Sequence, residues 1–260
     1  MTKRARSLVL DYVARSSHAQ TLLTSSPRAF YPVMHKHLDR RFDTLARARS
    51  MIESMRWMEH VASAELAPRL FRGDIVTLAA LPDTTRITLG LNRLTFHEGL
   101  WAIDLTREDG LRLFTISFGW VKQSTLMLGC VQGPPREIDG LSCVRQLTDA
   151  AHGLRPAHLL MFILRVCARR WEIRHFIGVD EANQVKGRWN HRATERHFDY
   201  AAFWGAASGT PTPDGNWWLP VDVPARPIED VPTKRRAMYR RRYLMLDSLL
   251  NGVTSTLGSL

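Results

Sequence analysis

The sequence is poor in cysteine. Its 260 residues contain only Cys130, Cys143 and Cys167, an odd number without the spacing of a C-x-x-C motif or of a mixed Cys/His metal site. The three lie in apolar or helical surroundings, which predicts reduced thiols buried in a core. Reduced thiols are typical of a reducing compartment, so we expect a cytoplasmic protein.

Long apolar runs are also missing. The most apolar stretch, residues 159–164, is far shorter than the roughly 20 residues that span a bilayer. The basic N-terminus is followed by an apolar segment that Asp11 and Arg15 interrupt, which argues against a signal peptide. Any contact with the inner membrane is therefore expected to be peripheral.

Acidic residues are few relative to basic ones. Asp and Glu number 25 against 36 Lys and Arg, which gives a formal net charge of +11. Phosphates, nucleic acid or an anionic membrane surface would suit this charge, but so would a solvated basic surface without a partner. Hydrophobic residues make up 45% of the chain, which excludes a mostly disordered protein and permits one large core.

Three regions differ in their patterns. Residues 1–66 have helical periodicity, clearest over residues 43–63, and should pack on the core as a helical N-terminal region. Residues 67–222 should form a mixed α/β core that begins with an antiparallel meander, because short β-branched runs between residues 75 and 131 alternate with turn signals. Residues 223–260 combine a Pro-rich linker with a basic helix. We expect one compact unit overall.

The second half of the core predicts a crossover. Helices are expected over residues 138–152 and 156–171, the second apolar nearly all round, and a strand over residues 173–179 follows it directly. A strand after a buried helix implies a right-handed connection and parallel pairing with an earlier strand. A short helix over residues 198–207, a turn and a last strand over residues 217–221 complete an α/β (α+β) fold with a mixed sheet.

The last strand of the meander ends abruptly at Gln132-Gly133-Pro134-Pro135. A sheet of this order can open where the meander meets the crossover, which would place Gln132 and Gly133 in a cleft facing the start of the next helix. Backbone amides at that helix start could receive a phosphate or an acyl carbonyl. An ordinary change from strand to loop is the alternative.

Charged residues near this break are candidate ligands and catalysts. Arg136 and Arg155 could neutralise a phosphate, unless they only solvate helix ends. Asp180 and Glu181 follow the predicted parallel strand at its carboxyl end, where one of them could be a general base. Asp at this position is also a common helix cap. No spacing among the histidines predicts a metal site.

Basic residues dominate the C-terminal helix, where six of the nine residues 234–242 are Lys or Arg. An apolar stripe on the same helix should pack on the core and hold Arg236 and Arg240 outward as a fork for phosphates, with Tyr239 closing the site. A membrane-surface helix and plain solubility are the rival interpretations. No recognised nucleic-acid module accompanies the cluster, so nucleic acid is expected only as a tRNA donor.

Five stretches in order resemble the VirK/YbjX family of bacterial proteins: "LGCVQGP", "HGLRPAHLL", "IGVDEANQV", "YAAFW" and "KRRAMYRRRYLMLD". The resemblance implies an association with virulence, envelope maintenance and resistance to antimicrobial peptides, without a defined reaction. It also implies His in many relatives where this chain has Gln184. If that His had a catalytic role, the role would here pass to His191 or be lost.

The element order also resembles an N-acetyltransferase-like core. The pyrophosphate-binding pattern of those enzymes, a basic residue followed by Gly-x-Gly or Gly-x-Ala, is absent from this chain. The resemblance therefore does not firmly imply any cofactor. Acyl-CoA, acyl-carrier protein or aminoacyl-tRNA could be the acyl donor. A non-catalytic factor that binds a protein partner or an anionic membrane surface is the alternative from another class.

Overall fold

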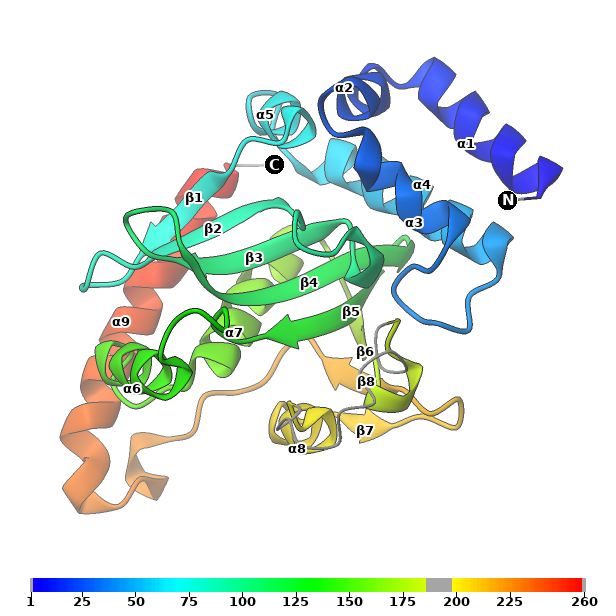
Figure 1. Cartoon of the computed structure of the whole chain (residues 1–260). Helices are drawn as coiled ribbons and strands as arrows, with labels where there is room; N and C mark the ends of the chain where they lie inside the picture. The colour runs from blue at the N-terminus through cyan, green and yellow to red at the C-terminus, as the bar shows by residue number, and fades with distance from the viewer. Residues whose placement is uncertain (1, 186–197, 259–260) are drawn as a thin grey trace.

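A mixed sheet of eight strands organises the chain in a computed structural model that describes residues 2–185 and 198–258 (Figure 1). The strand order is β1-β2-β3-β4-β5-β6-β8-β7. The strands are β1 Val76–Ala80, β2 Arg86–Leu91, β3 Trp101–Thr106, β4 Arg112–Lys122, β5 Thr125–Gln132, β6 His175–Gly178, β7 Thr210–Pro211 and β8 Trp217–Pro220.

The predicted pairing is confirmed. Strands β1 to β5 form an antiparallel meander, and β5 pairs with β6 in parallel. Strand β8 then runs antiparallel to β6. The predicted turn before the last strand contains one short strand, β7, because Thr210 and Pro211 pair with Trp218 and Trp217 across a hairpin.

Helices from both the N-terminal and the C-terminal part of the chain flank the sheet. The amphipathic helix predicted over residues 43–63 is α4, and the Asp43 side chain caps its start by accepting from the Ala46 amide. The helical region extends past its predicted end at residue 66, because α5 begins there. The elements are α1 Lys3–Arg15, α2 Ser17–Ser25, η1 Pro27–Phe30, α3 Tyr31–Met34, α4 Thr44–Val61, α5 Leu66–Arg72, η2 Phe96–Glu98, α6 Gly140–Ala150, α7 Pro156–Arg170, η3 Glu181–Asn183, α8 Tyr200–Ala206, η4 Ile228–Asp230 and α9 Thr233–Leu257.

The two faces of the sheet are covered by different helices. Side chains alternate along β4: a Cβ at Gly119 would meet the Ser54 hydroxyl of α4, whereas Trp120 packs on Trp171 at the end of α7. Helices α7 and α9 lie behind the sheet in Figure 1, and the N-terminal helices lie beside its upper end. The cysteines predicted to be core thiols are buried, and none of them forms a disulfide within the described residues.

A buried carboxylate ties the N-terminal segment to the last hairpin. Asp39 accepts from the Arg41 guanidinium at 2.6 Å and from the Asn216 amide at 2.9 Å. Asn183 donates to Asn216, and the Arg40 amide donates to the Asn183 carbonyl, so η3 is held between the two segments. Burial alone would raise the pKa of Asp39, but these donors outweigh it and hold the pKa below its usual value.

We predict that Asp39→Asn lowers the free energy of unfolding at pH 7 by about 1–3 kcal/mol, because buried donors lose a charged acceptor. A depressed carboxyl pKa stabilises the fold above the unfolded value near 4, and this stability is lost as the pH falls through the folded pKa. Wild-type stability should therefore decline below pH 4 more steeply than that of the variant, as measured by urea unfolding.

Asp214→Asn is the matched control, because its exposed carboxylate lies 3.6 Å from the same guanidinium. It should change stability by less than about 1 kcal/mol. Equal losses in the two variants would contradict the assigned role of Asp39.

Candidate functional site

The sheet opens between β5 and β6. Their parallel pairing runs from Thr125 opposite His175 to Leu128 opposite Gly178, and the Val179 amide makes the last bond, to the Leu128 carbonyl at 3.1 Å. Beyond this point β5 continues beside β4 as far as Gln132, without β6 on its other side. The opening therefore begins before the Gln132-Gly133 break.

Gly129 lies at an irregularity in the pairing of β5 with β4. Its position falls at a register shift, since Leu128 pairs with Phe118 but Cys130 pairs with Ser117. A Cβ at Gly129 would lie only 1.8 Å from the Glu98 carbonyl oxygen. Because only glycine permits this approach, the bulge fixes η2 against β5.

Side chains replace β6 along the open edge of β5. The Gln184 amide donates to the Gly129 carbonyl at 3.4 Å. The Tyr200 hydroxyl accepts from the Val131 amide at 3.2 Å and donates to the Val131 carbonyl at 3.1 Å. Burial raises the pKa of Tyr200, so the phenol stays neutral and can serve as both donor and acceptor.

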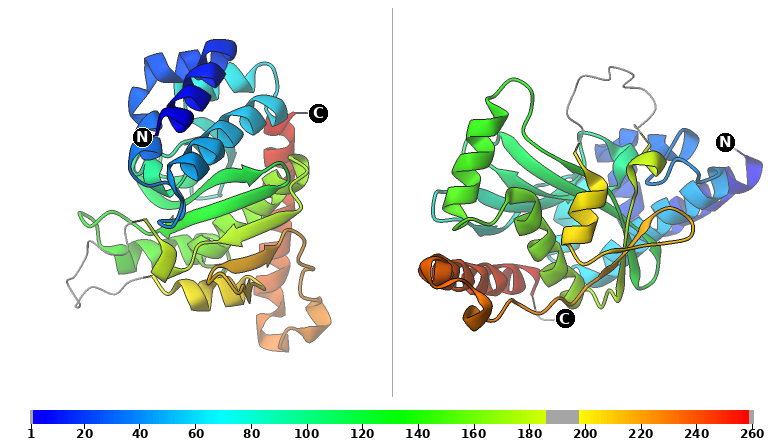
Figure 2. Two further views of the ribbon diagram at one scale, coloured as in Figure 1. Left: turned by 90° about the vertical axis from the view of Figure 1, so that its right-hand side faces the viewer. Right: turned by 90° about the horizontal axis from the view of Figure 1, so that it is seen from below.

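A cavity of about 930 Å³ lies at the end of β5, and its volume is in the range of ligand-binding clefts. In the right-hand view of Figure 2, α6 and α8 stand on opposite sides of α7, whose first residues contribute to the cavity. The described lining residues are Glu98, Arg112, Phe114, Val131, Gln132, Gly133, Pro134, Pro135, Arg136, Asp139, Gly140, Leu141, Val144, Arg155, Pro156, Ala157, Glu181, Gln184, Phe198 and Tyr200.

The cavity contains one helix start that no side chain caps. Asp139 closes the start of α6, because its carboxylate accepts from the Leu141 and Ser142 amides. At the start of α7, Arg155 occupies the N-cap position without a side-chain cap, and Pro156 follows it. The helix start suited to an anion is therefore that of α7 rather than that of α6, the helix next after the break.

Arg112 is a cavity residue that sequence reasoning missed. Its guanidinium donates to the Thr115 hydroxyl at 2.7 Å, and that hydroxyl donates to Asp104. Burial raises the pKa of Asp104 to about 6, even though Thr115 and Arg112 act in the opposite direction. The three side chains form a chain across β3 and β4 that orients Arg112. Only the strand register brings them together, so no sequence motif marks them.

Glu98 was also missed, because the sequence indicates only a turn there. Its buried carboxylate accepts from the Gln132 amide at 2.7 Å and from the Thr95 hydroxyl. Gln132 is thus held at the cavity by an acid from another element. The backbone does not require glycine at position 133, because a Cβ there would meet Phe114 at an ordinary 3.6 Å. The absent side chain instead leaves space in the cavity.

The predicted site residues divide into two groups. Gln132, Gly133, Arg136, Arg155 and Glu181 all line the cavity.

Asp180 is not among the described lining residues. Its carboxylate caps η3 by accepting from the Ala182 amide, and it accepts from the Trp217 indole at 3.0 Å. Asp180 therefore caps a helix, which was the alternative to its interpretation as a general base. His191 lies outside the described residues.

The described lining residues of the cavity also do not include the three predicted residues of α9, Arg236, Tyr239 and Arg240. Arg236 donates to the carbonyls of Val231 and Glu229, each at 3.0 Å. The Arg242 guanidinium lies over the Tyr239 ring, 4.2 Å from the ring centre. Arg240 is exposed.

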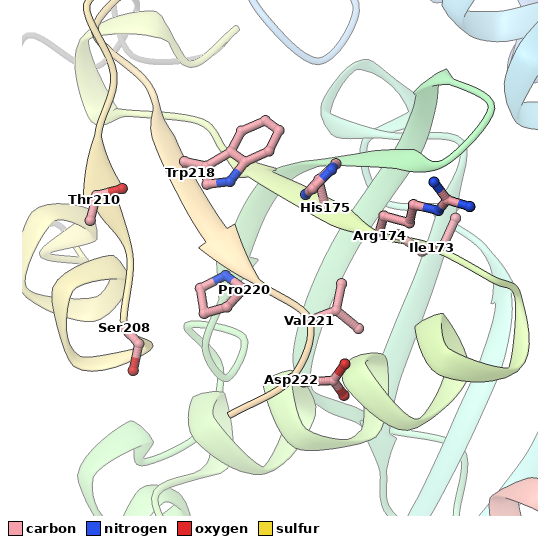
Figure 3. Close-up of a pocket in the computed structure, with 9 residues that line it drawn as sticks. All are labelled: Ile173, Arg174, His175, Ser208, Thr210, Trp218, Pro220, Val221 and Asp222. Carbon is pink, nitrogen blue, oxygen red and sulfur yellow. The ribbon is translucent and has the colours of Figure 1, made fainter. Parts of the chain in front are cut away.

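A second hollow, of about 570 Å³, lies at the opposite end of β6 (Figure 3). The His175 and Trp218 rings face each other there, with centres 4.5 Å apart. Asp222 lies at its edge, 3.5 Å from Arg169. None of the residues predicted from the sequence to form a site is among its described lining residues.

Residues 2–185 and 198–258 lack two further features. In that part of the chain no helix combines the length and apolarity needed to cross a bilayer. No group of three or more His, Cys, Asp or Glu side chains there could hold a metal ion.

Comparison with known proteins places the chain among related bacterial sequences. The family described as "Protein of unknown function (DUF535)" matches residues 1–255. An "Uncharacterized protein" of Haemophilus influenzae is 27% identical over 94% of this chain and 82% of its own length. "Uncharacterized protein YbjX" of Escherichia coli is 31% identical over 58% of this chain, a match that spans only 47% of YbjX. "Membrane protein LapB" of Mannheimia haemolytica is 26% identical over 68% of this chain and 76% of LapB.

Among solved structures, a mutant of a cAMP-binding acyltransferase from Mycobacterium smegmatis aligns with 84% of this chain and 64% of its own. The TM-score is 0.33 and the sequence identity 9%. The match to YbjX confirms the family resemblance seen in the five sequence stretches.

We predict that Tyr200→Phe lowers the free energy of unfolding by about 1–3 kcal/mol, because the Val131 amide and carbonyl lose their partner inside the protein. Tyr243→Phe is the control, since its hydroxyl bonds the Arg226 carbonyl at an exposed position. It should cost less than about 0.5 kcal/mol. Urea unfolding of both variants measures the difference, and equal effects would count against Tyr200 as the group that completes β5.

Proposed function

The chain belongs to the DUF535 family, and from the cavity at the end of β5 we propose that it transfers an acyl group from a phosphate-bearing donor. Acyl-CoA, acyl-carrier protein and aminoacyl-tRNA are donors of this class. One observation supports the proposal most directly. Three arginines and the uncapped start of α7 line one cavity, at the end of β5 that β6 does not pair with.

The cations supply the binding of the donor. Arg112, Arg136 and Arg155 line the cavity, and Arg155 stands at the start of α7, where the helix dipole adds partial positive charge. Arginine binds phosphate oxygens through paired N–H donors, and such charge-assisted bonds are stronger than neutral ones. The cavity also contains Glu98 and Glu181, so a phosphate is expected near the α7 start rather than throughout the cavity.

The transfer step requires a proton acceptor and a polar group near the acyl carbonyl. When the donor is a thioester, an amine or hydroxyl of the substrate that receives the acyl group attacks the carbonyl and loses a proton. The C–S bond then breaks, and the released thiolate takes up a proton. Glu181 is exposed at the cavity and can accept the first proton. Gln132, held by Glu98, can orient the carbonyl. Asp180 is the weaker candidate base because both of its oxygens already accept bonds.

A second candidate function is peripheral binding to an anionic surface. Lys234, Arg235, Arg240 and Arg241 are exposed on the first half of α9, and a relative bears the name "Membrane protein LapB". Such a helix could attract acidic lipid headgroups without any chemistry at β5.

We predict that coenzyme A and 4′-phosphopantetheine bind the wild-type protein, and that Arg155→Ala weakens coenzyme A about tenfold or more by removing a charged hydrogen-bond donor. Arg240→Ala, an exposed arginine of α9, should leave this affinity within about twofold. Isothermal titration calorimetry gives both numbers. Glu181→Gln should retain coenzyme A affinity but lose transfer of the acyl group to amines.

The result against the proposal would be no binding of coenzyme A, of phosphopantetheine or of aminoacyl-tRNA. A finding that only vesicles with acidic lipids bind, and that Arg240→Ala but not Arg155→Ala weakens them, would favour the second candidate.

A further inference from the structure

Helix α6 has apolar side chains on two faces. Cys143 and Leu147 are buried in the core, as expected for the inner face of an amphipathic helix. Leu141 and Val144, three residues apart and therefore neighbours on the helix surface, line the cavity, and Val144 also packs against the core. Leu141 is 77% exposed, one of the most exposed large hydrophobic side chains described. A second apolar face beside a cavity indicates an apolar ligand.

Other described apolar residues contribute to this lining. Phe114 of β4 is buried at the cavity, and Phe198 lies before α8 with its ring centre 5.0 Å from that of Tyr200. The rings of Phe198 and Phe203 are also in contact, so Phe203 helps to hold Phe198 in position. The prolines after β5 and at the start of α7 add further apolar surface.

The cavity is therefore amphipathic. Its apolar side chains come from β4, α6 and the segment before α8, while Arg136 and Arg155 supply cations at the end of β5 and the start of α7. We propose that the cavity binds a medium or long aliphatic acyl chain joined to an anionic group, with the chain lying against Leu141 and Val144. This inference rests on the proposed acyl transfer and specifies the substrate class.

Hydrophobicity favours this chain over an acetyl group. A two-carbon acyl group would leave the 77% exposed Leu141 side chain in water, whereas a longer chain would cover it. Each methylene transferred from water to an apolar wall should tighten binding about fourfold. The affinity should therefore rise along a series of donors that differ only in chain length.

The experiment measures dissociation constants for coenzyme A and for acetyl-, hexanoyl-, decanoyl- and palmitoyl-CoA, with free fatty acids of the same lengths as a second series. Below the micelle concentration, affinity for the thioesters should rise about fourfold per methylene and then level off. Leu141→Ser should weaken decanoyl-CoA about tenfold and leave acetyl-CoA unchanged. Leu244→Ser is the matched control, since Leu244 is 70% exposed on α9 and does not line the cavity.

The outcomes separate this inference from the proposed function. Equal affinity for coenzyme A and all its thioesters, abolished by Arg155→Ala, would overturn the acyl-chain site and leave the donor site intact. A chain-length dependence for fatty acids without any binding of coenzyme A compounds would keep the chain site but overturn the phosphate-bearing donor. Equal weakening by Leu141→Ser and Leu244→Ser would overturn the chain site.

Discussion

The structure of the site depends on how the open edge of β5 satisfies its backbone hydrogen bonds. A strand that loses its neighbour inside a protein leaves amides and carbonyls that are costly to bury unpaired. Here Gln184 and Tyr200 take the place of β6, bonding Gly129 and Val131. Because side chains rather than a strand fill this edge, the sheet can remain open, and the end of β5 borders a cavity instead of a continuous ladder.

Distant parts of the chain hold these side chains in place. The Asp39 network fixes η3, which precedes Gln184, against the last hairpin. The Gly129 bulge admits the Glu98 carbonyl, and the Glu98 carboxylate then holds Gln132. On the neighbouring strands, Asp104 and Thr115 orient Arg112. Of the three arginines that line the cavity, Arg112 is thus held in place by neutral and acidic partners, as preorganisation of a cation requires.

Patterns in the sequence predicted the elements because each has a local cause. Short β-branched runs indicated the meander, the apolar helix before β6 indicated the parallel crossover, and helical periodicity over residues 43–63 indicated α4. The partners at the site have no local cause. The contacts of Glu98 with Gln132 and of Tyr200 with Val131 join residues 34 and 69 positions apart. Arg236 illustrates the reverse case, since its spacing with Arg240 indicated a phosphate fork but nearby carbonyls take up its guanidinium.

Hydrogen exchange followed by mass spectrometry, with and without coenzyme A, tests most directly whether the open end of β5 is a donor-binding site. Bound ligand should slow exchange in residues 129–136 and 155–160 and leave the first half of α9 unchanged. The α7 start should respond most, because its amides have no side-chain cap. Slower exchange confined to residues 233–243, or no change anywhere at saturating coenzyme A, would contradict the account.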